Sequence, residues 1–544
     1  MTQKVTLCSA TLGEDGRHEP PLGPLYIASA FEQMGVEVDF RDFQLAKDGH
    51  CFSGETLAHY LSDHAETVAI SCFLDMLPAV VDAARILHGA RPDTKVVIGG
   101  PGPTPSARRI LEAYPTISGV VRGEGEETVQ DWVRFQRGEH KGPIPGMTYR
   151  DGDTLIEGPE RPRLRALDEL PGPAWHLIDW NRYTNARVIT TRGCSYRCSF
   201  CDVTALWGGR SVFRGLDATI TEIEMLRDRF GQGMIAIVDD TFVLNRERVE
   251  EFCHKLIERR SNVYWGCFGR INLMTHDLID LMAEAGCRAI FYGIDSGSQR
   301  VLDRTVKHVR VKDIVPMLKV SAQYYQRIEA SFIWGYPFET LEDFSATLDV
   351  ASEASLLAPV VNVQLHMLSP LPLSPIYREF AGQLIDPEPE DSRWLLLPAV
   401  LLDDRAERVR DLVRTHPDIY TGFYTLPTPN KNEKRLQLDQ VMRSLTRMIG
   451  STVLDKRTAQ LLKEDADDVE RELLAAHPEA AERIGVGLAL GLFRRTRYRK
   501  QFEAGVMPFE GTRGASLVRE RPEFTTTGGV AAGIKPLLPN PGFD

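Results

Sequence analysis

The sequence lacks a long apolar run and the features of an export signal. No stretch approaches the roughly 18 uncharged apolar residues that a membrane-spanning helix needs. The first residues, Met1-Thr2-Gln3-Lys4-Val5, are not a basic region followed by an apolar segment and a small-residue cleavage site. We therefore expect a cytoplasmic protein without a membrane span.

An excess of positive charge is also missing. The chain has 64 Lys and Arg against 76 Asp and Glu, which gives a net charge of −12. Proteins that bind the nucleic-acid backbone usually present a basic surface, so we do not expect nucleic acid as a partner. A small molecule or a peptide is a more natural partner for this charge.

Low-complexity tracts and internal repeats are absent as well, and the composition is that of a globular protein. Hydrophobic residues make up 43% of the chain, charged residues 26% and aromatic residues 8%. A chain of 544 residues is too long for one ordinary core. We expect two or three domains.

Residues 1–140 alternate strand and helix patterns. Strands are predicted at 5–10, 36–40, 68–73, 95–100 and 119–122, with helices at 22–35, 77–89 and from about 126. This rhythm predicts an α/β domain with a parallel, doubly wound, Rossmann-like sheet. Ligands of such sheets bind beyond the carboxyl ends of the strands. Glycines cluster there, at Gly99, Gly100, Gly123 and Gly125, where backbone can approach a bulky ligand closely.

The remainder divides into three further parts. Residues 141–186 are rich in Pro and Gly and predict a linker with a small hairpin near 147–156. Residues 187–380 contain six strand–helix units, which fit a partial (β/α)6 barrel of the TIM type. The predicted strands are 187–191, 234–238, 264–268, 289–293, 329–333 and 361–367. Residues 381–544 are predicted to be mainly helical, with the longest helix at 456–477 and a Gly- and Pro-rich tail.

Three of the nine cysteines lie within eight residues, as Cys194, Cys198 and Cys201. They follow the first predicted barrel strand, at the end where such barrels place their active sites. Thiolates at this spacing can hold an iron–sulfur cluster from one loop. Because no fourth cysteine lies nearby, one iron would stay open to a chelating ligand. A zinc site is the alternative, although zinc usually has paired cysteines and a fourth ligand close by.

The spacing Cys194-x3-Cys198-x-Phe200-Cys201 resembles the signature of the radical S-adenosylmethionine superfamily. The resemblance implies a [4Fe–4S] cluster on these cysteines and S-adenosylmethionine on the open iron. Four later stretches agree with it, and the S-adenosylmethionine contacts that they imply are Asp239, Asp240, Arg270, Asp295 and Ser296. The fourth stretch, Gly335-Tyr336-Pro337-Phe338-Glu339-Thr340, resembles the turn after the fifth strand of related enzymes. Asp295 stands where that family has a longer Glu.

The first domain resembles the cobalamin-binding domain of one subfamily, the class B radical S-adenosylmethionine methyltransferases. Pro21-Leu22-Gly23-Pro24-Leu25-Tyr26, Ile98-Gly99-Gly100-Pro101 and Arg122-Gly123-Glu124-Gly125-Glu126 carry this resemblance. It implies cobalamin contacts at Ser71, Cys72, Phe73, Gly99, Gly100, Gly123, Glu124 and Gly125. The cobalt-ligating His of other cobalamin proteins is absent from Asp42-Phe43-Gln44-Leu45, as it generally is in this subfamily. A domain that binds nothing is the alternative.

Together these resemblances imply methylation of an unactivated carbon. S-adenosylmethionine on the cluster would yield a 5′-deoxyadenosyl radical, and methylcobalamin would deliver the methyl group to the substrate radical. Two alternatives remain open: a rearrangement, cyclisation or oxidation without methyl transfer, and a non-catalytic carrier of cluster or cobalamin. The expected partners are an external electron donor of the flavodoxin or ferredoxin kind and a natural-product, lipid or peptide substrate. Tyr420, Phe423 and Tyr424 are expected to line the substrate site.

Overall fold

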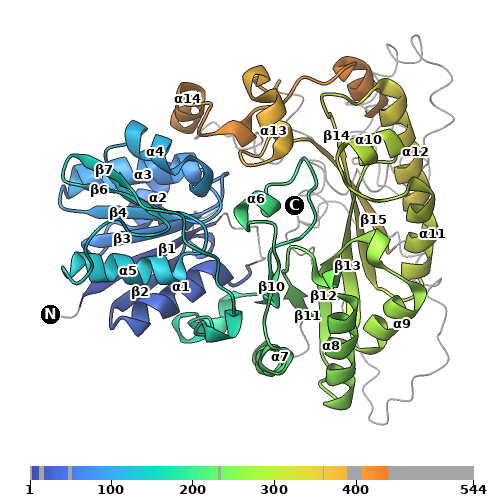
Figure 1. The fold of residues 1–544 in the computed structure, drawn as a ribbon, viewed down its shortest axis with the longest axis horizontal. Helices are drawn as coiled ribbons and strands as arrows, with labels where there is room; N and C mark the ends of the chain where they lie inside the picture. Colours follow the sequence, from blue (N-terminus) through green and yellow to red (C-terminus); the bar gives the residue numbers. More distant parts are fainter. Residues whose placement is uncertain are drawn as a thin grey trace, which may run out of the picture. The chain divides into compact units, whose positions relative to one another are not determined.

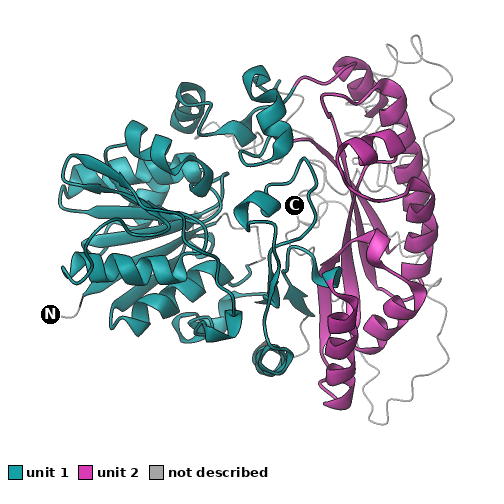
Figure 2. Ribbon diagram, in the orientation of Figure 1, with its two compact units in different colours: residues 1–244, 369–426, 544 teal, residues 245–368, 427–543 magenta. Residues whose placement is uncertain are grey.

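A computed structural model describes residues 3–11, 18–46, 52–230, 234–358, 360–388 and 407–438. The predicted helix at 456–477 and the C-terminal tail lie outside these residues. The chain forms two compact units (Figure 2). Unit 1 comprises residues 1–244 and 369–426, and unit 2 comprises residues 245–368 and 427–543. The predicted boundaries at residues 140, 186 and 380 therefore do not coincide with these units and stay predictions.

Unit 1 contains a seven-stranded sheet in the order β2-β1-β3-β4-β5-β6-β7 (Figure 1). The first five strands pair in parallel and the last two in antiparallel fashion. The strands are β1 (Lys4–Ala10), β2 (Glu37–Asp42), β3 (Thr67–Cys72), β4 (Lys95–Gly99), β5 (Ile117–Val121), β6 (Met147–Asp151) and β7 (Thr154–Glu157). The parallel sheet is confirmed, and the predicted hairpin is the β6–β7 pair, which extends this sheet at its edge.

Helices cover both faces of this sheet, as a doubly wound domain requires. Strand residues alternate between two cores: Val96 and Ile98 of β4 pack into one cluster, and Val97 packs into the other. One face carries α1 (Leu22–Gln33) and α5 (Glu126–Gln136); the other carries α2 (Gly54–Tyr60), α3 (Leu77–Ala90) and α4 (Ala107–Ala113). The carboxyl ends of β1–β5 consequently share one edge.

The first two barrel strands also belong to unit 1. β8 (Ala186–Val188) pairs in parallel with β11 (Met234–Ile237). Between them lie β9 (Thr191–Arg192), α6 (Val203–Leu206), β10 (Val212–Phe213) and α7 (Leu216–Phe230). The strand predicted at 187–191 ends earlier, since β9 turns to pair with β10 in antiparallel fashion.

Unit 2 contains the other four barrel strands, which pair in parallel in chain order. They are β12 (Tyr264–Gly269), β13 (Cys287–Asp295), β14 (Arg327–Trp334) and β15 (Val361–Met367). The helices of this unit are α8 (Arg246–Glu258), α9 (His276–Glu284), α10 (Gln299–Arg304), α11 (Val311–Ser321) and α12 (Leu341–Leu357). All six predicted barrel strands are thus present, two in unit 1 and four in unit 2.

The segment after the barrel returns to unit 1. It contains α13 (Pro375–Phe380) and α14 (Glu407–Thr415), and α14 packs on α3. Tyr420 and Phe423 are fully buried in the core cluster of the first domain, and Tyr420 bonds to the Tyr114 hydroxyl at 3.1 Å. Tyr424 lies in the same cluster. These rings stabilise the domain core, so their expected place at the substrate site is wrong.

No helix within the described ranges is both long enough and apolar enough to cross a membrane.

Candidate active site

The carboxyl ends of β3 and β4 form one part of the candidate site. The Gly102 amide donates to the Cys72 carbonyl at 3.2 Å, which brings the two following loops together. Gly100 has φ +99°, and a Cβ there would lie 2.7 Å from the Cys72 carbonyl oxygen. Only glycine therefore allows this approach. Phe73 is 57% exposed at the same edge and offers an aromatic face to a ligand.

Ser71, Cys72, Gly99 and Gly100 are thus gathered where neighbouring strands end. Ser71 pairs with Gly99 across the β3–β4 ladder, and Cys72 is buried. Gly123, after β5, has φ +68° and no heavy atom within 4 Å of a built Cβ, so its surface is open. Gly125, by contrast, packs against Ile27 of α1. The glycine-lined edge fits the approach of a large ligand.

Gln44 lies in the stretch Asp42-Phe43-Gln44-Leu45, which lacks the cobalt-ligating His of other cobalamin proteins. Its Nε2 donates to Asp42 Oδ2 at 2.7 Å and to the Glu19 carbonyl at 2.9 Å. Its Oε1 accepts from the Glu19 amide at 3.3 Å. Tyr183 also donates to Asp42 Oδ2, at 2.9 Å, while burial raises the pKa of Asp42 to about 6. The amide oxygen and nitrogen of the Gln44 side chain therefore both form hydrogen bonds within the protein.

The three cysteines of the triplet lie in the loop between β9 and α6. Cys194 and Cys198 are buried, and Cys201 is partly exposed. The Cys201 amide donates to the Cys198 carbonyl at 3.1 Å, which closes a tight turn. The Ser199 carbonyl accepts from the Ile376 amide at 2.8 Å, so the start of α13 supports the loop. Across the described ranges, no three Cys, His, Asp or Glu side chains surround a single point as they would around one ion.

Asp239 and Asp240, at the end of β11, hold the backbone that leads into this loop. Asp239 Oδ1 accepts from the amides of Thr190 and Thr191, at 2.6 and 3.0 Å. Asp240 Oδ2 accepts from the Gly193 amide at 2.8 Å. Both carboxylates thus contact the chain just before Cys194. Their contact with S-adenosylmethionine stays a prediction.

In unit 2, Arg270 and Asp295 meet at Lys307. Arg270, after β12, donates to the Lys307 carbonyl, and the Lys307 ammonium pairs with the Asp295 carboxylate. All three residues are buried. Asp295 has φ +70°, a left-handed conformation that is uncommon outside glycine, so the end of β13 is strained. The sequence pattern did not identify Lys307, which belongs to no motif.

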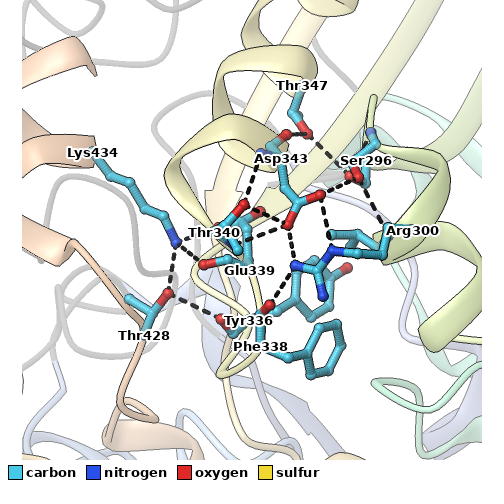
Figure 3. A network of polar contacts seen from close by, with 12 residues as sticks. Ser296, Arg300, Tyr336, Phe338, Glu339, Thr340, Asp343, Thr347, Thr428 and Lys434 are labelled. Atoms are coloured by element: carbon cyan, nitrogen blue, oxygen red, sulfur yellow. Dashed lines mark hydrogen bonds and ion pairs between the residues drawn. The ribbon is translucent and has the colours of Figure 1, made fainter.

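The loops after β13 and β14 are joined through α12 (Figure 3). Ser296 Oγ lies 3.0 Å from Thr347 Oγ1, and Ser298 Oγ donates to Asp343 Oδ1 at 2.6 Å. Arg300 pairs with Asp343 and donates to the Phe338 carbonyl at 2.6 Å. Ser296 therefore contacts Thr347 of α12, while its contact with S-adenosylmethionine stays a prediction.

A buried ion pair holds the turn after β14. Glu339 Oε2 accepts from the Gly335 amide at 2.8 Å and from Lys434 Nζ at 3.0 Å. Lys434 Nζ also donates to Thr428 Oγ1 at 2.8 Å (Figure 3). Both charged side chains are fully buried. Lys434 lies almost a hundred residues from the turn, and nothing in the sequence around it indicated this role.

Two family models match the chain. The B12 binding domain matches residues 9–133, and the Radical SAM superfamily matches residues 188–351. The first covers the end of β1 and the parallel strands β2–β5, and the second covers the cysteine loop and most of the barrel.

Several curated proteins are similar to the chain. An uncharacterised methyltransferase of Pyrococcus horikoshii is 27% identical over 63% of this chain and 75% of its own length. The cytidylyl-2-hydroxyethylphosphonate methyltransferase of Streptomyces wedmorensis is 26% identical over 68% and 79%. The anaerobic magnesium-protoporphyrin IX monomethyl ester cyclase of Cereibacter sphaeroides is 27% identical over 67%, and the chain spans 61% of that cyclase.

Solved structures show the same architecture. The radical S-adenosylmethionine methyltransferase TsrM of Kitasatospora setae superposes with a TM-score of 0.61 at 18% identity, over 80% of this chain and 87% of that one. The cobalamin-dependent S-adenosylmethionine radical enzyme OxsB gives 0.59 at 15% identity, over 95% and 83%. At these identities the likeness concerns the fold.

Proposed function

We propose that this chain, which belongs to the cobalamin-binding branch of the radical S-adenosylmethionine superfamily, is a cobalamin-dependent C-methyltransferase. The observation that supports the proposal most is that one chain contains both a B12 binding domain and a radical SAM domain. Relatives named as methyltransferases support the methyl-transfer outcome.

The residues present fit both cofactors. Cys194, Cys198 and Cys201 lie on one short loop between β9 and α6, at a spacing that lets three thiolates hold a [4Fe–4S] cluster. On the first domain, the surface at Gly123 after β5 is open, and Phe73 after β3 is exposed. Gln44 is occupied by internal contacts, which is consistent with cobalamin bound without a His ligand from this loop.

The chain's own residues position the reacting groups. When bound, the cluster supplies the electron that cleaves S-adenosylmethionine, and cobalamin supplies the methyl carrier. Asp239 and Asp240 orient the backbone before Cys194. We assign Arg270, Asp295 and Ser296 to S-adenosylmethionine, because they follow successive strands of the barrel. Their buried contacts fix the loops in advance, which reduces the entropy lost on binding.

We further propose a small-molecule, lipid or peptide substrate and a flavodoxin- or ferredoxin-like electron donor. A reductant is required because cleavage of S-adenosylmethionine consumes an electron at the cluster. Donors of this kind act in the cytoplasm, where we place the protein.

The cluster assignment is tested by anaerobic reconstitution with iron and sulfide, followed by dithionite and S-adenosylmethionine. The wild-type protein should release 5′-deoxyadenosine, and Cys201→Ala should release none. Cys253→Ala is the matched control: Cys253 is a buried cysteine of α8 far along the chain from the loop, and its variant should retain cleavage. Cleavage that persists in Cys201→Ala would refute the assignment.

A second outcome, cyclisation without methyl transfer, is favoured by the similarity to the magnesium-protoporphyrin cyclase. Both outcomes use the same cofactors, so product mass separates them. Methyl transfer adds one CH₂ unit to the substrate, whereas cyclisation or oxidation leaves its carbon count unchanged.

A further inference from the structure

Arg192 connects the cysteine loop to the first domain. It ends β9, two residues before Cys194. Its Nη2 donates to Glu126 Oε1 at 2.6 Å, and its Nη1 donates to Glu124 Oε1 at 3.3 Å. The three side chains are only 9%, 6% and 6% exposed. This is a buried cation shared by two carboxylates.

Both carboxylates come from the ligand edge of the first domain. Glu124 lies between Gly123 and Gly125 in the loop after β5, and Glu126 is the first residue of α5. The Arg192 guanidinium also lies over the Tyr26 ring of α1, 5.2 Å from its centroid. Arg192 thus contacts the loop and both helices at the edge that we assign to cobalamin.

A second arginine reinforces this contact from the linker. Arg163 Nε lies 3.5 Å from Glu124 Oε2. Its Nη1 donates to the Trp207 carbonyl at 2.8 Å, and its Nη2 donates to the Arg192 carbonyl at 3.3 Å. Trp207 follows the cysteine loop, so Glu124 is linked to the chain on both sides of the cysteines.

Buried charges make this connection rigid. A carboxylate or guanidinium out of water is strongly disfavoured without its partner, so the three groups must move together. A ligand that orders the Gly123–Gly125 loop would fix Glu124. Glu124 would in turn fix Arg192, which lies two residues before Cys194. Such coupling between two sites is reciprocal, because each ligand must change the affinity of the other by the same factor.

We propose that Arg192 is a positioning residue that couples cobalamin binding to the cluster loop through Glu124 and Glu126. This inference rests on the proposed function, since it requires that the chain bind both cofactors. Cobalamin then stabilises the cysteine loop in the conformation that holds the cluster, and the cluster tightens cobalamin.

The test is the dissociation constant for hydroxocobalamin, measured anaerobically by absorbance in the full-length protein with and without a reconstituted cluster. Cobalamin should bind the cluster-loaded wild type more tightly than the cluster-free wild type, by a factor of about 5 to 100. In Arg192→Gln and in Glu126→Gln the ratio should fall to about 1. As the reciprocal measurement, bound cobalamin should slow loss of the cluster to a chelator in the wild type but not in Arg192→Gln or Glu126→Gln.

Arg161→Gln provides the matched control. Arg161 is also a linker arginine, and it pairs with Glu127 and Asp131 of the same helix α5. Its other contacts among the described residues, with Thr128 and the Pro145 carbonyl, do not reach the cysteine loop. Its variant should keep the wild-type ratio. A purely structural role for Arg192 would lower the melting temperature without changing the ratio.

The wild-type ratio decides the inference even if Arg192→Gln does not fold. A ratio of 1 in the wild type, or an unchanged ratio in folded Arg192→Gln, would overturn the coupling and leave the proposed function standing. Failure of either form to bind cobalamin would overturn both proposals.

Discussion

Carboxylates at strand ends show how residue-level roles depend on the fold. The sequence places Asp239 and Asp240 after a strand, where an acidic side chain suits a ligand amine. In the structure their oxygens accept from the amides of Thr190, Thr191 and Gly193. A pattern predicts where a carboxylate lies along the chain, but the donors that reach it come from some fifty residues away.

Asp239 should therefore be needed to hold the cysteine loop. Asp239→Ala leaves two buried amides without their acceptor, and we expect a loss of about 3 kcal/mol in the free energy of unfolding. Less iron should be retained per chain after reconstitution. Urea unfolding and iron analysis measure both effects. Asp153→Ala, in the exposed β6–β7 turn, is the control and should match the wild type.

Asp42 should produce a pH dependence of stability. Burial raises the pKa of Asp42 from 3.8 to about 6, so the folded protein binds its proton more tightly than the unfolded chain does. The free energy of unfolding therefore falls as the pH rises through this interval, and the loss persists above it. A shift of this size corresponds to about 3 kcal/mol.

Asp42→Asn removes this titration. Between about pH 4 and about pH 8, the free energy of unfolding of the wild type should fall by about 3 kcal/mol relative to that of the variant. Denaturant unfolding at the two pH values measures it, with Asp153→Asn as the control. An Asp42→Asn profile parallel to that of the wild type would show that Asp42 is ionised normally.

At the scale of elements, hydrophobic periodicity and the positions of Gly and Pro predicted most strands and helices of the described residues. The strand predicted at 95–100 is β4 (Lys95–Gly99), and the helix predicted at 22–35 is α1 (Leu22–Gln33). The first barrel strand was predicted too long. Residues Thr191–Arg192 pair with β10 instead, because Asp239 binds the backbone at Thr190 and turns the chain. No local pattern contains that contact.

The same limit applies to the C-terminal segments. Tyr420 and Phe423 were expected to line the substrate site. They pack instead into the core of the first domain, about three hundred residues earlier in the chain. Lys434 likewise pairs with Glu339 across a long sequence separation. Both contacts depend on tertiary structure that periodicity does not contain.

The turn after β14 should depend on the Lys434–Glu339 pair. Lys434→Met leaves the Glu339 carboxylate buried without a cation, so we expect a loss of about 3 to 5 kcal/mol in unfolding free energy. The double variant Lys434→Met, Glu339→Gln removes both charges and should recover part of this loss. Urea unfolding of the three proteins measures the pattern. A double variant less stable than Lys434→Met would contradict it.

At the scale of the whole molecule, each of the two matched domains contributes one of the two cofactor sites that we propose. The B12-binding domain contributes a glycine-lined sheet edge, and the radical S-adenosylmethionine domain contributes the cysteine loop. The domain types and the loop were predictable from motifs, since their glycines and cysteines are set by backbone geometry and ligand chemistry. The roles of Arg163 and Arg192, which join the loop to the first domain, were not predictable. Their ion-pair partners lie far away in the sequence, and no repeating pattern marks them.

The central claim is that this chain transfers methyl groups through cobalamin. The most direct measurement follows the label when the reduced, reconstituted protein with bound cobalamin receives methyl-labelled S-adenosylmethionine, a step that needs no knowledge of the substrate. The account predicts that labelled methyl is recovered on the protein-bound cobalamin. Release of 5′-deoxyadenosine with cobalamin unlabelled would contradict it and assign the chain to the non-methylating enzymes of its family.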